Sequence, residues 1–298
     1  MRGLLLIDKP KEFTSFDVVA VLRGITKQRR IGHTGTLDPM ATGVLPVLVG
    51  NATRLADILP SNDKAYRAEF RFGIKTDTLD IWGNVLRREQ TCHTLAEIEA
   101  ALPLFTGDIM QMPPMYSAVK QNGKRLYEIA RKGGEVARPA RPATVYSIKI
   151  IGFDEPEQTL TLDIHCAGGT YIRSLCDDLG EKLGSCAAMS SLRRTMACGF
   201  SLTQCVCLAQ LKEDGAEKHL LEPQAALRGY NEVRVSEKQA ARFLCGGALD
   251  ISRLTLPAVP ATSKAADEYL LVYHKYRFLG VGKLDETAKQ LKVRCLFD

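Results

Sequence analysis

The chain has 298 residues, a length typical of about two domains, and 45% of them are hydrophobic and 25% charged. These values are ordinary for a folded globular protein. No apolar segment approaches the roughly 20 residues that cross a bilayer, and the apolar run before Asp8 is too short for the core of a signal peptide. We therefore expect a cytoplasmic protein that makes no membrane contact.

The net charge of +6 is concentrated in one short stretch of the chain. Between Val119 and Pro142 only Glu128 and Glu135 oppose seven basic residues, which are Lys120, Lys124, Arg125, Arg131, Lys132, Arg138 and Arg141. Such a patch permits an anionic partner without identifying it. The nine cysteines include no Cys-x-x-Cys pair, so they predict reduced thiols and assign no metal.

The elements expected in chain order mix strands and helices without a regular alternation. They are a strand at residues 4–7, a helix at 15–28, strands at 44–49 and 65–72, helices at 95–104 and 127–131, strands paired as a hairpin at 145–153 and 159–166, a helix at 172–183, a linker at 213–231, a short helix at 236–244, and strands at 270–284 and 291–297. Thr14 and Asp17 begin the first helix with a pattern like a capping box. The mixture predicts an α+β fold.

The stretch GHTGTLDPMATGVLPV places a single acid, Asp38, in a loop rich in glycine and threonine. One interpretation is structural: Asp38 followed by Pro39 suits the first positions of a one-turn helix that Gly43 would end. The other is functional, with Asp38 as a nucleophile or general base held by a rigid turn. His33 is a candidate for substrate contact, but it forms no recognised metal spacing with Asp38.

Two further stretches carry residues with both a structural and a functional interpretation. Tyr66 at the start of a strand is either ordinary packing or a ring that stacks on a base. Asp77 and Asp80 in TDTLD resemble paired carboxylates, but turns explain them better. Arg173, in GTYIRS beside Tyr171, is either a solvated charge or a cation that keeps a catalytic carboxylate ionised.

Four blocks of sequence occur in one order and together carry a resemblance to a known family. They are GHTGTLDPMATGVLP, the KAYRA…FG…TDTLD run, QMPPMYSAVKQNGKRLYEIARKG, and GTYIRSL…DLG…LRRT. From residue 3 to about residue 210 the chain resembles the bacterial TruB family of tRNA pseudouridine synthases, which act on uridine-55 of the TΨC loop. The tail, with LLVYHKYRFLGVGKL, is similar to that family's small PUA-like RNA-binding module.

The resemblance implies an architecture and a partner. The fold would be α+β, with a mixed, largely antiparallel sheet flanked by helices and a small C-terminal β module. The catalytic domain would cover residues 1–230, with an RNA-gripping basic insertion at about 119–142, and the PUA-like module would cover 231–298. The partner would be tRNA, bound through its T-arm stem-loop by a monomer that requires no cofactor and no metal.

The resemblance also implies roles for individual residues of this chain. Asp38 would be the catalytic aspartate, and Arg173 would be the arginine that pairs with it. Tyr66 would stack on the target base. Tyr171 and Leu192 would form part of the pocket wall. Lys9 would support the active-site loop, and His33 would help to fill the space left by the extruded base.

The chemistry of such a reaction fits one carboxylate. Pseudouridine formation breaks a C–N glycosidic bond, turns the uracil and rejoins it through carbon, with no redox change. The carboxylate would act at the sugar, as in glycosidase chemistry, or would add to uracil C6. Two other functions stay open: a tRNA-binding or folding-assistance module without catalysis, and a nucleotide-sugar glycosidase that uses Asp38 with Asp77 or Asp80.

Overall fold

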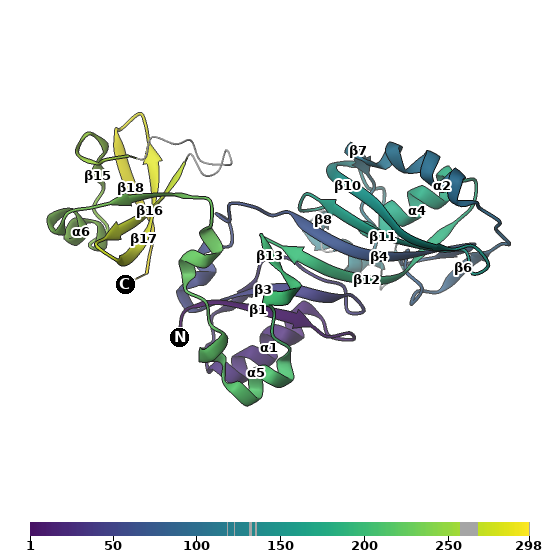
Figure 1. Ribbon diagram of the computed structural model, residues 1–298, viewed down its shortest axis with the longest axis horizontal. Coiled ribbons are helices and arrows are strands. Elements are labelled where there is room, and N and C mark those ends of the chain that lie inside the picture. Colours follow the sequence, from purple (N-terminus) through teal and green to yellow (C-terminus); the bar gives the residue numbers. More distant parts are fainter. Residues whose placement is uncertain (118, 122, 131–132, 135, 257–267, 298) are drawn as a thin grey trace. The chain divides into compact units, whose positions relative to one another are not determined.

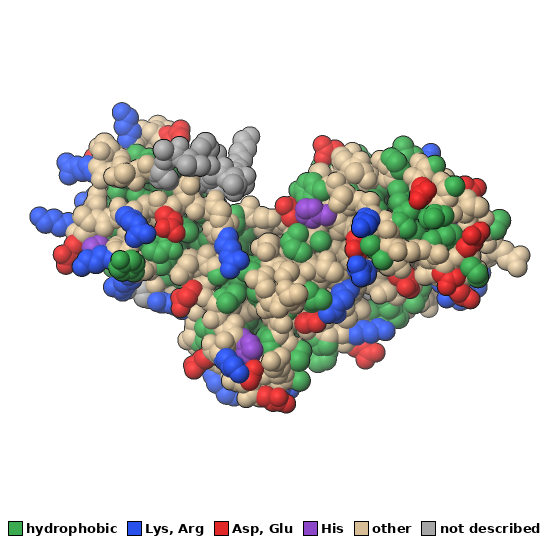
Figure 2. All heavy atoms as spheres, viewed as in Figure 1, with side chains coloured by type: hydrophobic (Ala, Val, Ile, Leu, Met, Phe, Trp, Pro, Cys, Tyr) green, Lys and Arg blue, Asp and Glu red, His purple; other side chains and the backbone are tan. Residues whose placement is uncertain are grey.

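The computed structural model describes residues 1–117, 119–121, 123–130, 133–134, 136–256 and 268–297 (Figure 1). The chain divides into two compact units. The first unit consists of residues 1–39, 44–62 and 198–298, and the second of residues 40–43 and 63–197. Figure 2 shows acidic and basic side chains interspersed over the visible surface of the chain. In the part of the chain described here, no helix is long and apolar enough to cross a membrane.

A largely antiparallel sheet forms the centre of the second unit. Its strands follow the order β12–β4–β11–β10–β7, with bounds β4 (Lys64–Phe72), β7 (Gly107–Gln111), β10 (Arg141–Asp154), β11 (Thr159–Cys166) and β12 (Ala187–Ala197). The start of β3 (Thr42–Val49) pairs with β12 in parallel. The sheet is therefore mixed and largely antiparallel, as predicted.

The alternation of residue types in β4 explains which face of this sheet is covered. The buried residues of β4 include Tyr66, Ala68 and Phe70. Arg67 and Arg71, which point to the opposite face, are exposed. Strand β11 alternates in the same way, and its buried residues lie opposite the buried residues of β4. Each buried large apolar side chain of this face contributes about 1.5–3 kcal/mol to the free energy of unfolding.

The remaining elements of the second unit are short, apart from one helix that packs on the sheet. Helix α4 (Ile172–Lys182) packs against β12 and β4. The others are the hairpin of β5 (Ile74–Thr76) and β6 (Val85–Arg88), α2 (Leu95–Ala101), the hairpin of β8 (Lys120–Gln121) and β9 (Lys124–Arg125), and α3 (Leu126–Ala130).

The N-terminal part of the first unit has its own apolar core. Strands β1 (Gly3–Lys9), β2 (Ile31–His33) and β3 are neighbours, and α1 (Ser15–Thr26) and α5 (Leu208–Asp214) contribute residues to the same core. Thr14 caps α1, and the Asp17 side chain accepts a hydrogen bond from the Thr14 backbone in return. The capping box predicted from the sequence is therefore present.

The linker expected at residues 213–231 is wrong. After α5 the chain forms 3₁₀ turns at Ala216–His219 and Pro223–Leu227, and Ala216, Leu227 and Tyr230 are buried. Leu221 pairs with Leu4 of β1 through two backbone hydrogen bonds of 2.9 Å. The segment looks polar in sequence because its apolar residues form only short runs between charged and polar residues. The contacts of Ala216, Leu221 and Leu227 nevertheless lie inside the first unit.

The C-terminal residues form the β module that the sequence predicts. Its five-stranded sheet follows the order β14–β16–β17–β18–β15, and its elements are β14 (Asn231–Arg234), α6 (Glu237–Leu244), β15 (Leu249–Asp250), β16 (Tyr269–His274), β17 (Arg277–Asp285) and β18 (Gln290–Leu296). A separate apolar cluster, which includes Val233, Phe243 and Val272, forms its core. The predicted α+β class with a small β module is confirmed.

Candidate active site

Asp38 lies half-buried in the loop between β2 and β3, and the backbone on both sides of it is anchored. The Leu37 N–H donates to Ser15 Oγ at 2.8 Å, and Ser15 Oγ donates to the Leu37 carbonyl at 3.3 Å. On the other side, Lys9 Nζ donates to the Pro39 carbonyl at 3.0 Å. Because both peptide neighbours of Asp38 are fixed, the position from which its carboxylate extends is fixed as well.

Lys9 is fully buried, which is rare for a lysine side chain unless its charge is compensated. Its ammonium group has three donors, and it donates to the carbonyls of Pro10, Phe13 and Pro39. These carbonyls come from the turn after β1, the approach to α1 and the Asp38 loop. Lys9 therefore ties the Asp38 loop to the N-terminal segment.

The interpretation of Asp38 as a helix cap is wrong. Pro39 and Met40 form a turn that leads directly into β3 at Thr42, so no helix follows Asp38. Gly43 has a different use: its φ is +103°, and a Cβ atom there would lie 2.1 Å from the Arg194 carbonyl oxygen. The glycine permits close contact between β3 and β12 rather than the end of a helix.

Arg173 lies at the start of α4, and its side chain is buried rather than solvated. Nη1 donates to the Thr78 carbonyl and Nη2 to the Tyr116 carbonyl, both at 2.9 Å. The Asp80 carboxylate lies 3.7 Å from Nη1. A buried guanidinium needs such partners to offset the cost of its desolvation. The solvated-charge interpretation of Arg173 is therefore wrong.

The acids of the TDTLD run make turns, as the sequence favoured. Asp77 accepts hydrogen bonds from the backbone and side-chain nitrogens of Asn84 at 2.8 and 2.9 Å. Asp80 accepts from Thr78 Oγ1 at 2.7 Å and from the Trp82 N–H at 3.3 Å. The ion pair of Asp80 with Arg173 was not predicted. No sequence signal indicated it, because the two residues are far apart in the chain.

Gln111 is a second residue that sequence reasoning missed. Its buried side chain accepts from the Tyr171 N–H at 3.0 Å and donates to the Tyr171 carbonyl at 3.3 Å. Tyr171 is the N-cap residue of α4 but makes no side-chain cap. Nearby, Ser174 Oγ donates to the Met112 carbonyl at 2.8 Å. Strand β7 therefore fixes the start of the helix that carries Arg173.

Tyr66 and Leu192 share one face of the sheet. Tyr66 on β4 lies opposite Arg194 on β12, and Leu192 lies opposite Ala68, two residues along. Tyr66 has 6% of its surface exposed and Leu192 has 8%. His33 is separate from this pair: it is half-buried at the end of β2 in the first unit, where it lies opposite Val47.

An acidic group lies further along α4. Lys75 Nζ is 3.2 Å from Asp177 Oδ1 and 2.9 Å from Glu181 Oε1. Burial raises the pKa of Asp177 above its ordinary value, and burial together with the neighbouring acids raises the pKa of Asp178 to about 6. One lysine does not fully offset these carboxylates, so this part of the helix gains stability when a proton binds.

The described part of the basic segment at 119–142 contains the β8–β9 hairpin, α3 and the start of β10. Lys120 lies opposite Arg125 across the β8–β9 pair, which also includes Lys124. Arg131 and Lys132 lie outside the described residues. Arg138 Nη1 donates to the Pro113 carbonyl at 3.0 Å, and Arg141 begins β10 opposite Gln111 of β7.

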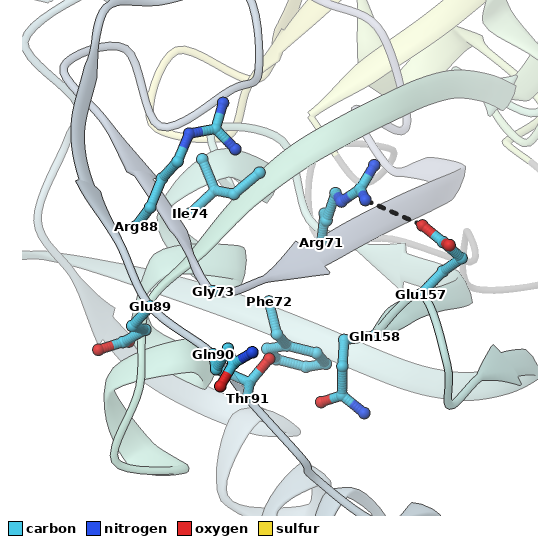
Figure 3. Close-up of a pocket in the computed structure, with 10 residues that line it drawn as sticks. All are labelled: Arg71, Phe72, Gly73, Ile74, Arg88, Glu89, Gln90, Thr91, Glu157 and Gln158. Carbon is cyan, nitrogen blue, oxygen red and sulfur yellow. Dashed lines mark hydrogen bonds and ion pairs between the residues drawn. The ribbon is translucent and has the colours of Figure 1, made fainter.

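A pocket of about 460 Å³ lies in the second unit and contains none of the residues predicted from the sequence (Figure 3). Its walls are Arg71, Phe72, Gly73, Ile74, Arg88, Glu89, Gln90, Thr91, Glu157 and Gln158. Arg71 pairs with Glu157 at 3.0 Å on its rim, and Gln158 is bonded to the backbone of His93. Arg71, Glu157 and Gln158 therefore already have partners within the unit.

Solved structures share this fold along the whole chain. A chain in "Structure of H/ACA RNP bound to a substrate RNA containing 2'-deoxyuridine" has a TM-score of 0.72 and 22% identity, covering 99% of this chain and 85% of that one. A chain in "Crystal Structure of a Cbf5-Nop10-Gar1 Complex" has a TM-score of 0.73 and 25% identity, with the same coverage.

The class of protein follows from family models: "TruB family pseudouridylate synthase (N terminal domain)" matches residues 23–172, and "tRNA pseudouridylate synthase B C-terminal domain" matches residues 173–229.

Curated relatives agree with these matches. "tRNA pseudouridine synthase B" of Clostridium perfringens (strain ATCC 13124) is 42% identical over 297 residues, or 98% of each chain. The protein of the same name from Clostridium tetani is 38% identical over 98% of this chain and 99% of its own. That of Synechocystis is 43% identical over 87% of this chain and 88% of its own. The chain belongs to the TruB family of pseudouridylate synthases.

Proposed function

We propose that this chain isomerises uridine-55 in the T loop of tRNA to pseudouridine, with Asp38 as its catalytic residue. The observation that carries the proposal is the 42% identity with a curated tRNA pseudouridine synthase B across 98% of both chains. The anchoring of the Asp38 loop supports it, because Ser15 and Lys9 hold the backbone on both sides of the carboxylate.

The reaction requires one bond to be exchanged for another within the same nucleotide. The bond from C1′ to uracil N1 breaks, a bond from C1′ to C5 forms, and the proton on C5 is released while N1 gains one. In one route Asp38 attacks C1′ as N1 leaves, through an oxocarbenium-like state, and its bond to C1′ breaks when C5 bonds to that carbon. In a second route Asp38 removes the C2′ proton as N1 leaves and returns it to C2′ when C5 bonds to C1′. Addition of Asp38 to uracil C6 is the alternative. Each route requires an ionised carboxylate and neither consumes a cofactor.

The other predicted residues take supporting roles in this proposal. Arg173 stabilises the ionised form of Asp38, and Tyr66 stacks on the flipped uracil. Tyr171 and Leu192 form part of the wall of the base pocket. His33 occupies the space that the uracil leaves in the RNA, and flipping that base costs a few kcal/mol, which stacking in the pocket offsets.

The basic segment supplies the affinity for the RNA backbone. Its hairpin carries Lys120, Lys124 and Arg125 on two short strands, and the other basic side chains predicted to bind RNA are Arg131, Lys132, Arg138 and Arg141. Phosphate contacts of this kind make affinity fall steeply with salt. We propose that the enzyme works in the cytoplasm as a monomer on the T-arm stem-loop.

The C-terminal module, residues 231–298, is proposed to bind RNA as a PUA-like domain beside a catalytic domain of residues 1–230. The support lies at the turn between β16 and β17. Tyr276 at this turn is 96% exposed and stands between Lys275 and Arg277. Arg234 Nη1 donates to the Lys275 carbonyl at 2.7 Å, which stiffens the turn. An exposed ring flanked by cations suits contact with RNA bases and phosphates.

The test is the release of tritium from tRNA that contains 5-³H-uridine. Asp38→Asn preserves the size of the side chain and removes its charge, and we expect the rate to fall by about 10³-fold or more because the nucleophile is lost. Asp57→Asn is the matched control, because its exposed carboxylate pairs with Arg294 on the surface of the same unit.

Retention of full activity by Asp38→Asn would overturn the assignment of Asp38. Chromatography of the products separates the other functions. A glycosidase would release free uracil, and a pure binding module would bind the tRNA but release no tritium. Asp77 and Asp80 are poor candidates for the second catalytic carboxylate of a glycosidase, because both make hydrogen bonds in turns and Asp80 also pairs with Arg173.

A further inference from the structure

Trp82 is the only tryptophan of the chain, and it lies in the turn between β5 and β6. Its side chain is 39% exposed, and its neighbour Ile81 is 40% exposed. Tryptophan is highly buried on average, and its large ring gains free energy when it is removed from water. Nothing in the proposed reaction so far uses this ring.

The turn that carries Trp82 is rigid. Thr76 Oγ1 donates to the Asp80 carbonyl at 2.7 Å, and the Ile81 N–H donates to the Met189 carbonyl of β12 at 3.0 Å. Asp77 binds both nitrogens of Asn84 across the turn. At Gly83 a Cβ atom would lie 2.2 Å from Thr78 Oγ1, so a larger residue would have to displace the Thr78 side chain. The ring is therefore held on a preorganised platform.

The platform is connected to the buried arginine of the candidate site. The Trp82 N–H donates to Asp80 Oδ1 at 3.3 Å, and Asp80 Oδ2 lies 3.7 Å from Arg173 Nη1. Thr78 in the same turn accepts from Arg173 through its carbonyl. All of these residues belong to the second unit. The backbone N–H of Trp82 therefore shares the Asp80 carboxylate with Arg173, which places the start of the Trp82 side chain close to this ion pair.

We propose that Trp82 stacks on a nucleobase of the substrate RNA, at a nucleotide of the T loop other than the target uridine. The inference rests on the proposed function, which brings the T loop to Arg173. Stacking suits this position because every base has a π-face and a rigid ring loses little entropy on contact. Trp82 is therefore a residue that binds the T loop of the RNA, whereas Tyr66 stacks on the flipped uridine itself.

The size of the exposed surface favours a base over a protein partner. A stable protein interface buries about 800 Å² on each side, whereas Ile81 and Trp82 are two partly exposed side chains on one turn. Val85 and Leu86 on β6 are exposed too, but successive residues of a strand face opposite sides and do not both extend this surface. One ring with an apolar neighbour matches the face of one base.

The fluorescence of the single tryptophan provides a direct test. The Asp38→Asn chain, which retains Trp82 but does not consume substrate, is titrated with an unmodified T-arm stem-loop. We expect saturable quenching of the emission, with a midpoint equal to the Kd measured separately from the anisotropy of fluorescein-labelled RNA. If the anisotropy shows binding while the emission stays unchanged, the inference is wrong. An emission change that depends on protein concentration without RNA would indicate a second copy at this surface and would also overturn it.

Substitutions test whether the contact contributes to binding. Trp82→Ala should raise KM about 10-fold with kcat within about twofold, given what base–aromatic stacking contributes per base. Trp82→Phe keeps a stacking ring and should stay within about threefold of the original KM. The control is Leu104→Ala, which removes another exposed apolar side chain of the second unit. Equal effects of Trp82→Ala and Leu104→Ala would refute the inference.

The two proposals fail in different ways. If the proposed function is wrong, the unaltered chain releases no tritium from the T-arm stem-loop. If only the role of Trp82 is wrong, tritium release stays intact while the emission and the KM of Trp82→Ala do not change.

Discussion

The strongest test of how the Asp38 loop is held is Ser15→Ala. The Ser15 hydroxyl accepts from the Leu37 N–H at 2.8 Å and donates to the Leu37 carbonyl at 3.3 Å. Alanine removes both bonds and leaves a buried N–H without its acceptor, which costs about 1–3 kcal/mol. The carbonyl bond is long and adds little. We expect the free energy of unfolding to fall by about 2 kcal/mol.

The expected effect on catalysis is larger than a stability loss of this size would suggest. A misplacement of about 1 Å at a reacting group can cost about 100-fold in rate. Ser15 fixes only one side of the loop, and Lys9 still holds Pro39. A partial displacement should therefore lower kcat about 10-fold with little change in KM. Tritium release at saturating tRNA measures kcat, and urea denaturation measures the free energy of unfolding.

Thr26→Ala is the matched control at the other end of the same helix. Thr26 is also buried, and its Oγ1 donates to the Leu22 carbonyl at 2.7 Å, far from the Asp38 loop in sequence. Its loss should lower the free energy of unfolding by about 1 kcal/mol and leave kcat unchanged. If Ser15→Ala and Thr26→Ala have the same kcat, Ser15 serves only stability and the reasoning about the loop is refuted.

Three further changes test other parts of the structure. Gln111→Ala should lower the free energy of unfolding by about 1–3 kcal/mol and reduce kcat/KM, because it frees the Tyr171 backbone at the start of α4; urea denaturation without any loss would contradict this. Asp178→Asn should stabilise the fold by about 1 kcal/mol at pH 8 and not at pH 3. The pKa of Asp178 in the folded state is about 6, so its carboxyl group becomes charged and the free energy of unfolding falls as the pH rises from about 4 to 6. Denaturation at both pH values checks the sign of this effect. Tyr276→Ala should weaken binding of full-length tRNA about fivefold and leave the T-arm stem-loop unaffected; equal loss for both RNAs, measured by anisotropy, would show that the module does not act separately.

The sequence predicted those elements whose residues repeat with a clear period. Strand β4 alternates buried and exposed residues over its full length, so its sequence alone indicated a half-buried strand. Strand β12, which lies between β3 and β4 in the same sheet, was missed. Its first three residues, Ala187, Ala188 and Met189, are all buried, and Arg194 near its end is fully buried as well. Burial on both faces removes the alternation that a strand prediction relies on.

The local pattern around Asp38 misled for a related reason. Asp followed by proline is a good helix start, and the strand predicted at 44–49 left room for a one-turn helix, whereas β3 begins two residues earlier, at Thr42. The decisive partner of Gly43 is the Arg194 carbonyl, which belongs to a strand far along the chain. Ser15 and Leu37 are likewise 22 positions apart. Contacts of this range have no periodic signal, so only the family resemblance indicated that the loop matters.

A catalytic aspartate needs both the correct position and the correct charge, and the anchors of the Asp38 loop act on its position. Ser15 and Lys9 bind backbone groups of Leu37 and Pro39, so they determine where Asp38 lies without requiring a bond to its carboxylate. The proposal assigns the charge that stabilises this carboxylate to a different residue, Arg173. It follows that the losses in kcat caused by Ser15→Ala and by Arg173→Gln should multiply in the double variant. A double variant no slower than the slower single variant would mean that the loop and the charge are not independent.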